Sequence, residues 1–232
     1  MIPIRDSAPR RGFPIVNIAF IMVNFLVFLY QLTLTPGELQ QFFRSYGTIP
    51  LQVTTSLGLF LRGSLPAPEL LSALFPLISA NFLHGGWLHL LGNMLYLWVF
   101  GDNIEGRLGH GSYLLAYLLM GAGSQMVHLL SDPLSPVPLV GASGAIAGVL
   151  GAYLILYPRS QILTLVPLGF FITFVRIPAL IFLPIWFLLQ LINATGAILF
   201  SSVQAVAWWA HVGGFIIGFL MARQVKKERP VY

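Results

Sequence analysis

Long apolar stretches with charges only at their borders are the feature that most constrains this chain. Six such segments cover about residues 14–34, 87–103, 110–130, 141–157, 178–199 and 204–222. A helix of about 20 mostly apolar residues crosses the hydrocarbon core of a bilayer. The pattern therefore predicts an all-α polytopic membrane protein with six transmembrane helices.

The composition agrees with a membrane protein rather than a soluble one. Of 232 residues, 57% are hydrophobic and 8% charged, whereas soluble domains carry about a quarter charged residues. This length suits one domain, so we treat residues 1–232 as a single membrane domain. The chain has no cysteine, which excludes disulfides, thiolate metal sites and a cysteine nucleophile.

The basic residues indicate lipid rather than nucleic acid, despite a net charge of +5. They gather in residues 5–11 and 223–229, beside apolar segments, where cations interact with anionic lipid. With the N-terminus inside, ten Lys and Arg residues fall on the cytoplasmic side and only Arg44 and Arg62 outside. The positive-inside rule thus predicts cytoplasmic termini, and we expect the plasma (inner) membrane as the location.

Two regions between the segments need separate interpretation. Residues 38–86 are of mixed polarity and contain four prolines, so we expect a long, structured first outer loop that is partly embedded in the membrane interface. Residues 161–175 are apolar but short and contain Pro167 and Gly169. As a further span they would place the basic C-terminus outside, so we interpret them as an interfacial or re-entrant segment.

Alternation of the six segments places four polar residues at one depth. His89 and Asn93 lie near the start of the second segment, Ser143 near the start of the fourth, and His211 about seven residues into the sixth. At 1.5 Å per residue, all four lie within roughly 10–15 Å of the outer surface. Polar residues inside a membrane usually face the bundle interior and mark function, so a nucleophile–base pair is possible here.

Each of these residues also has a plain structural explanation. Ser143 lies in a stripe of small residues that favours close helix packing, and His211 alone could be a core histidine bonded to a carbonyl. Asn93 alone is more often an interhelical hydrogen bond. His84 and His89 are five apart without an intervening Glu, which differs from the metalloprotease pattern. The joint occurrence of Ser143, His211, His89 and Asn93 at one depth nevertheless favours a catalytic site. We expect this site to use no metal and no cofactor.

Three motifs together resemble the signatures of rhomboid intramembrane serine proteases. They are His84-Gly-Gly-Trp-Leu-His89-Leu-Leu-Gly-Asn93, Gly141-Ala-Ser143-Gly144 and Ala210-His211-Val-Gly-Gly214. Glu105-Gly-Arg107 is similar to the short motif that follows the family's second helix. The order and spacing of the motifs also match, and the resemblance extends from the first apolar segment onward.

The resemblance implies a fold, a reaction and a role for each residue. The fold would be a rhomboid-like bundle of six transmembrane helices. Ser143 would be the nucleophile and His211 its general base, forming a dyad. The Ser143 backbone N–H and the side chains of His89 and Asn93 would stabilise the oxyanion. Gly213, Gly214 and Gly218 would bring the sixth helix close to the fourth.

The resemblance also implies the partners and shows one departure. Substrates would be transmembrane proteins in the lipid bilayer, cleaved in or next to their spans, and neither nucleic acid nor metal is expected. Where the family often has an aromatic ring that supports the base histidine, this chain has Ala147, so the ring is either supplied from elsewhere, by Trp208 or Trp209, or missing. The alternative function is a non-proteolytic rhomboid-like protein that binds transmembrane helices, although such proteins typically lack the serine or the histidine.

Overall fold

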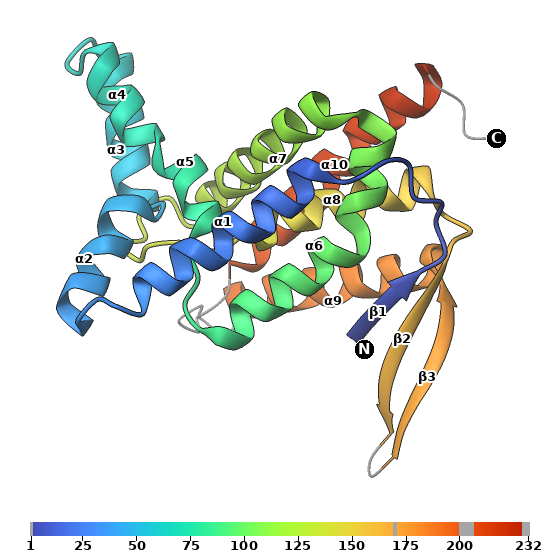
Figure 1. Cartoon of the computed structure of the whole chain (residues 1–232). Coiled ribbons are helices and arrows are strands. Elements are labelled where there is room, and N and C mark those ends of the chain that lie inside the picture. Colours follow the sequence, from blue (N-terminus) through green and yellow to red (C-terminus); the bar gives the residue numbers. More distant parts are fainter. Residues whose placement is uncertain (1, 169–170, 200–206, 229–232) are drawn as a thin grey trace.

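The computed structural model describes residues 2–168, 171–199 and 207–228, which form a helical bundle with a small sheet at one end (Figure 1). The longer helices of these ranges are α1 (Ile15–Gln31), α6 (Trp87–Leu108), α7 (His110–Ser131), α8 (Ser143–Leu156), α9 (Ala179–Leu199) and α10 (Trp208–Glu228). The connection from α1 to α6 contains α2 (Pro36–Tyr46), α3 (Pro50–Leu61), α4 (Ala67–Leu74), α5 (Pro76–Ser79) and the short 3-10 turn η1 (Ala80–Phe82).

The bundle is built around α8. Eleven of the fourteen residues of α8 are buried, and this helix packs against α6, α7, α9 and α10. Its sequence is apolar on every side, which is typical of a helix enclosed by other helices or lipid. The residue at the start of α8 is therefore surrounded by several elements.

The helices follow the six predicted segments, and their lengths differ. Helix α7 matches the predicted 110–130, α9 matches 178–199, and α6 continues beyond 103 to Leu108. The predicted segment 204–222 begins at residues outside the described ranges. The flanking residues 229–232 also lie outside them. By length and composition, two described helices can cross a membrane, His110–Ser131 and Ala179–Gly196, whereas Ile15–Gln31 and Ser143–Leu156 are apolar but shorter. The six-span bundle remains a prediction.

Glycines bring α8 and α10 into backbone contact. A Cβ atom at Gly214 would lie 2.0 Å from the carbonyl oxygen of Gly144, and one at Gly218 would lie 1.8 Å from that of Gly148. The predicted close approach of these helices through Gly214 and Gly218 is confirmed. The prediction was wrong for Gly213, which faces Val127 of α7 rather than α8.

The long first loop is structured, as predicted. Its helices start at prolines, since α2, α3, α4 and α5 each have Pro at the first or second position. Helix α2 also has a complete capping box between Thr35 and Glu38. Large apolar side chains on its surface, such as Leu61 and Leu71, are compatible with the predicted contact with the membrane interface.

The prediction of an all-α fold was wrong at the other end of the bundle. Strands β1 (Ile2–Asp6), β2 (Gln161–Leu168) and β3 (Phe171–Pro178) form an antiparallel sheet in the order β1-β2-β3. The segment 161–175, which we expected to be interfacial or re-entrant, is thus mostly a β-hairpin. Its content of Ile, Val, Thr and Phe favours strands, and pairing with β1 supplies hydrogen bonds that sequence inspection did not anticipate.

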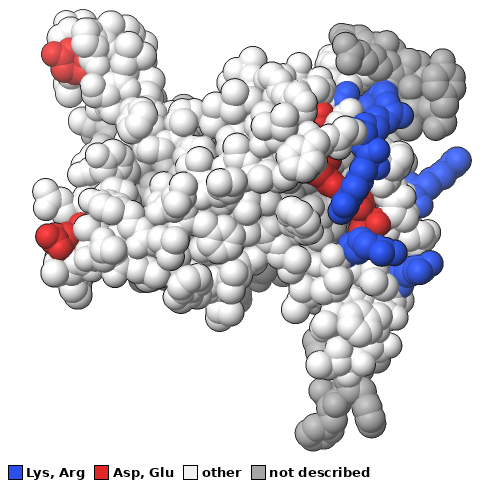
Figure 2. All heavy atoms as spheres, viewed as in Figure 1, with Lys and Arg blue, Asp and Glu red and all other residues white. Residues whose placement is uncertain are grey.

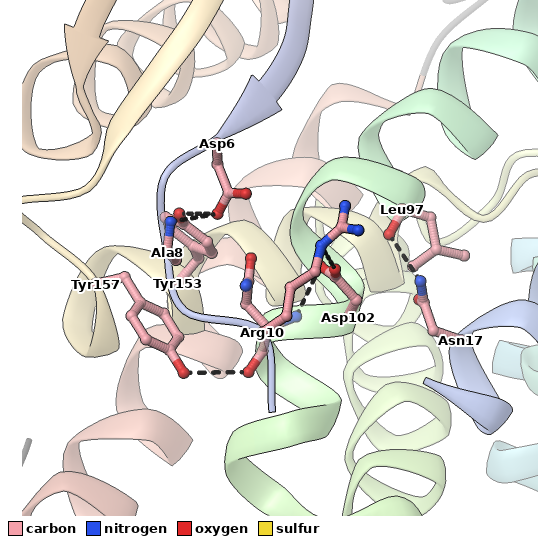
Figure 3. Close-up of polar contacts among 9 residues, drawn as sticks. Asp6, Ala8, Arg10, Asn17, Leu97, Asp102, Tyr153 and Tyr157 are labelled. Atoms are coloured by element: carbon pink, nitrogen blue, oxygen red, sulfur yellow. Dashed lines mark hydrogen bonds and ion pairs between the residues drawn. The ribbon is translucent and has the colours of Figure 1, made fainter. Parts of the chain in front are cut away.

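Polar contacts attach the N-terminal segment to the same end of the bundle (Figure 3). Tyr153 of α8 donates a hydrogen bond to Asp6, and Arg10 forms an ion pair with Asp102 of α6 at 2.9 Å. Glu105 of α6 accepts hydrogen bonds from the backbone N–H groups of Val16 and Asn17, at 2.9 and 2.7 Å. Because helix α1 has no side-chain cap of its own, the Glu105 carboxylate takes that place.

Candidate active site

Ser143 begins α8, after a turn held by the outer loop. The backbone N–H of Gly141 donates to the carbonyl of Ala80 at 2.9 Å, and Thr48 pairs with Leu139 through two backbone hydrogen bonds. Gly141 has a φ of 124°, a conformation that favours glycine. The turn therefore favours glycine at position 141, and contacts from η1 and from Thr48, just before α3, fix where the turn lies.

His211 meets Ser143 from α10. The distance between His211 Nε2 and Ser143 Oγ is 2.7 Å, a hydrogen-bond length, and His211 is buried. The two residues are 68 positions apart in sequence. The glycine contacts between α8 and α10 bring their helices close enough for this bond.

Gln190 of α9 contacts the other side of the His211 ring. Its Oε1 lies 2.9 Å from His211 Nδ1, and its Nε2 donates to the Trp186 carbonyl at 3.3 Å. Since only the amide nitrogen can donate to a carbonyl, the oxygen must face the histidine. It then accepts from Nδ1–H, which leaves Nε2 of neutral His211 unprotonated and able to accept the Ser143 hydroxyl proton.

Two tryptophans surround the His211 ring. Trp208 lies edge-on to it at a centroid distance of 5.8 Å, and the Trp186 ring lies at 6.3 Å. Ala147, where an aromatic support was expected, is fully buried. Of the two replacements considered from sequence, Trp208 lies beside the ring; Trp186 of α9 was not anticipated.

His89 and Asn93 lie beside the turn that precedes Ser143. A Cβ atom at Gly141 would come within 2.7 Å of His89 Cε1 and Nε2 and 3.8 Å of Asn93 Nδ2. These side chains therefore reach the backbone at Gly141, two residues before the serine. The four residues singled out from sequence thus line one region of the structure.

His84 connects Asn93 to α1. Asn93 Nδ2 lies 2.9 Å from His84 Nε2, and Gln31 holds the backbone of His84 by two hydrogen bonds, at 2.7 and 3.1 Å. Burial, assisted by the neighbouring His89, lowers the pKa of His84 to about 3. His84 is therefore neutral near pH 7, and its Nε2 can accept one Asn93 N–H while the second remains available.

These groups surround an open cavity of about 870 Å³. Its walls come from the start of α6, the start of α8, α9 and the start of α10. The polar members of the wall include Ser143, His211, Gln190, His89 and Asn93; the remainder is mainly apolar. A mostly apolar cavity with a few converging polar groups is the usual form of a binding or active site.

Among the residues that the structure describes, no acidic side chain lines this cavity. Asp102 and Glu105 are engaged at the opposite end of α6, with Arg10 and with α1. In the described part of the chain, no group of three His, Cys, Asp or Glu side chains could hold a metal ion. The arrangement is a serine, Ser143, hydrogen-bonded to one nitrogen of His211, whose second ring nitrogen is hydrogen-bonded to the amide of Gln190.

Sequence inspection missed Gln190, Trp186 and the role of His84. The available signal for Gln190 was a polar residue inside an otherwise apolar helix, where polar side chains generally face other helices. Asn193 and Thr195 in the same helix carry a similar signal. Only the packing of α9 against α10 distinguishes Gln190 from them.

Comparison with known proteins identifies the family. A family model of the rhomboid domain matches residues 72–228. The putative rhomboid protease YdcA of Bacillus subtilis is 31% identical over 66% of this chain and 69% of its own length, and the rhomboid protease GluP of the same species is 33% identical over 63% of this chain and 25% of its own. Rhomboid protein 1 of yeast mitochondria is 31% identical over 66% of this chain and 43% of its own. The chain thus spans less than half the length of two of these three relatives. It belongs to the rhomboid family.

Proposed function

We propose that this protein is an intramembrane serine endopeptidase that cleaves peptide bonds in or next to transmembrane segments. The observation that carries the proposal is the 2.7 Å contact between Ser143 Oγ and His211 Nε2. A serine hydroxyl is a weak nucleophile until a base removes its proton. Family membership and relatives named as proteases support the same reaction class.

The reaction proceeds through a Ser-His dyad. As Ser143 Oγ attacks the substrate carbonyl carbon, its proton moves to His211 Nε2 and the carbonyl oxygen becomes an oxyanion. His211 then donates that proton to the departing amine nitrogen, and the C–N bond breaks. Water, deprotonated by His211, then attacks the acyl-enzyme. His211 returns this proton to Ser143 Oγ as the ester C–O bond breaks, which releases the acid product and restores Ser143.

Gln190 supports His211 in this reaction. Its carbonyl oxygen keeps the Nδ1 proton in place, so Nε2 faces Ser143 as a base. When His211 becomes positively charged, the same oxygen stabilises the cation. Gln190 is therefore a positioning residue, in the place where many serine proteases have a carboxylate.

The oxyanion is stabilised by His89, Asn93 and the backbone N–H of Ser143. The Ser143 N–H lies in the first turn of α8, where backbone donors have no partner within the helix. His89 and Asn93 reach the adjacent Gly141 from α6. In a soluble protease, one such donor contributes about 100- to 1000-fold to kcat.

The substrate is the transmembrane segment of another protein. Its backbone carbonyls are engaged in helical hydrogen bonds within lipid, so the helix must unwind locally before Ser143 can attack. The cavity is large and open enough to accept such an extended stretch. We place both termini in the cytoplasm and the protein in the plasma (inner) membrane, on the distribution of its Lys and Arg residues.

Cleavage by purified, reconstituted protein tests this function. Ser143→Ala should abolish cleavage of a model transmembrane substrate, and His211→Ala should be nearly as damaging because the two groups act as a unit. His89→Ala and Asn93→Ala should each lower kcat by about 100-fold without abolishing it. The products are identified by mass spectrometry.

Labelling with a fluorophosphonate probe supplies the control. Wild-type protein and the exposed-serine variant Ser72→Ala should be labelled, whereas Ser143→Ala should not. Undiminished cleavage by folded Ser143→Ala would exclude the proposal. Folded wild-type protein that neither reacts with the probe nor cleaves would instead favour the non-proteolytic alternative.

A further inference from the structure

The sheet at the inner end of the bundle exposes one continuous face. Residues that pair across its strands point to the same side, and one row joins Arg5, Leu163 and Arg176 while the next joins Ile2, Leu165 and Phe174. Ile172 lies two positions before Phe174 and shares its side. We call this set, Ile2, Arg5, Leu163, Leu165, Ile172, Phe174 and Arg176, the outer sheet face.

The outer sheet face is apolar and uncovered away from the bundle. Ile172 is 67% exposed, Phe174 60% and Ile2 45%. The opposite face is different, since Pro3, Ile162 and Thr164 are buried. An exposed apolar patch of this kind requires either a partner or lipid.

The position of the hairpin favours lipid. It leaves the bundle at the end where α1 begins and runs across the direction of the long helices, beyond α9 (Figure 1). If those helices cross the membrane, the hairpin lies along the membrane plane at the inner interface. On the face shown in Figure 2, the part of the hairpin farther from the bundle is uncharged where it is visible, while Lys and Arg side chains gather at its base.

A separate cavity of about 350 Å³ lies at the base of this face. Arg5 and Arg176 line it, together with Ser7 and Gln161. Both arginines are exposed, and no ion pair involves them among the residues that the structure describes. Asp6 also lines the cavity, where its Oδ2 accepts hydrogen bonds from Tyr153 and from the backbone of Ala8. Two guanidinium groups against this one carboxylate leave a net positive charge.

We propose that this cavity binds the phosphate of an anionic phospholipid, with the lipid's acyl chains against the apolar part of the outer sheet face. Guanidinium groups match phosphate oxygens in geometry and charge. The apolar residues lie farther from the base, where they would enter the boundary between headgroups and acyl chains. Charge and apolar surface together thus select a lipid, rather than a soluble anion, as the occupant.

A single-cysteine label tests the proposal without relying on protease activity. Because the chain has no cysteine, Ile172→Cys can carry an environment-sensitive fluorophore in phosphatidylcholine vesicles with increasing phosphatidylglycerol. Lipids with a quencher near the headgroup should quench the label, increasingly so with phosphatidylglycerol. Changing Arg5→Gln or Arg176→Gln should raise the phosphatidylglycerol fraction needed for half-maximal quenching roughly fivefold each.

Matched controls make the outcomes distinct. Arg44→Gln with Arg62→Gln removes two arginines from the opposite end and should leave the titration unchanged. A label that stays accessible to aqueous iodide, or quenching that is independent of phosphatidylglycerol, would contradict the proposal. An equal response to inorganic phosphate in pure phosphatidylcholine would replace the lipid with a soluble anion. Because the readout is independent of cleavage, failure of the proposed protease function would not affect it.

Discussion

Gln190 is the residue whose role depends most on its surroundings. Its amide bridges the backbone of its own helix and the ring of His211 on another, through contacts at 3.3 and 2.9 Å. An amide in this position orients His211 without adding a charge to the bundle. In a membrane this is less costly than a buried carboxylate.

Replacing Gln190 with Leu should slow the chemical step. The variant removes the acceptor for the Nδ1–H group of His211. Because a hydrogen bond to a group that becomes charged contributes about 1.5–3 kcal/mol, kcat should fall roughly 10- to 100-fold, while KM changes little. Gln190→Glu retains an acceptor and should recover much of the rate. The measurement is steady-state cleavage together with the rate of fluorophosphonate labelling.

Gln125, on a different helix, provides a comparison for that variant. Gln125 of α7 is also buried and hydrogen-bonded, to the Leu77 carbonyl and Thr48, but is not among the residues that line the Ser143 cavity. Gln125→Leu should lower the melting temperature more than kcat. If Gln190→Leu shows the same pattern, with a reduced melting temperature and a normal kcat, Gln190 is structural only.

At the level of elements, the contact between α8 and α10 brings Ser143 and His211 together. Close approach in a membrane relies on small residues because lipid supplies no hydrophobic force between helices. Gly214 and Gly218 face the backbone of α8 directly. A side chain at either position meets backbone, which cannot rotate away.

Gly218→Ala should therefore separate the two helices. The added Cβ lies 1.8 Å from the Gly148 carbonyl oxygen, so we expect a loss of about 1–3 kcal/mol in stability from overpacking and a marked loss of cleavage. Gly111→Ala is the matched control on α7, where nothing lies within 4 Å of the new atom. Thermal unfolding in detergent compares them, and equal melting temperatures for the two variants would show that the contact is not tight.

The small sheet shows how one element escaped prediction. Residues 161–175 are as apolar as a buried segment, and periodicity alone does not distinguish a short helix from a strand in such a run. The strand conformation of this run is stabilised by β1, which pairs with β2 although the two are more than 150 residues apart in sequence. Such long-range pairing leaves no local signal in Ile2–Asp6.

For the whole molecule, the lengths of the helices bear on how it sits in a bilayer. At 1.5 Å per residue, α1 and α8 extend only about 26 and 21 Å, less than the roughly 30 Å of hydrocarbon. Helix α8 is enclosed by other helices, so its ends need not reach the lipid surface. Ser143, at the start of this short helix, would then lie below that surface, as an intramembrane site requires.

The predicted orientation can be checked with single cysteines. Glu69→Cys lies in the outer loop and Arg159→Cys on the opposite side, between α8 and β2; both positions are exposed. In intact cells, a membrane-impermeant maleimide should label position 69, and position 159 only after permeabilisation. The reverse pattern would invert the topology, and labelling of both positions in intact cells would argue against a membrane-spanning bundle.

The sequence by itself determined the apolar segments, their order and the four polar residues at one depth, because hydropathy and charge bias act locally along the chain. It also indicated that Gly214 and Gly218 would allow α8 and α10 to pack closely, since close packing in lipid requires small residues. Only the tertiary structure decided that Gln190 and Trp186 face His211, that Gly213 faces α7, and that β1 completes a sheet. Those outcomes depend on which helix faces and strand edges meet, and such contacts between distant residues have no periodic pattern in the sequence.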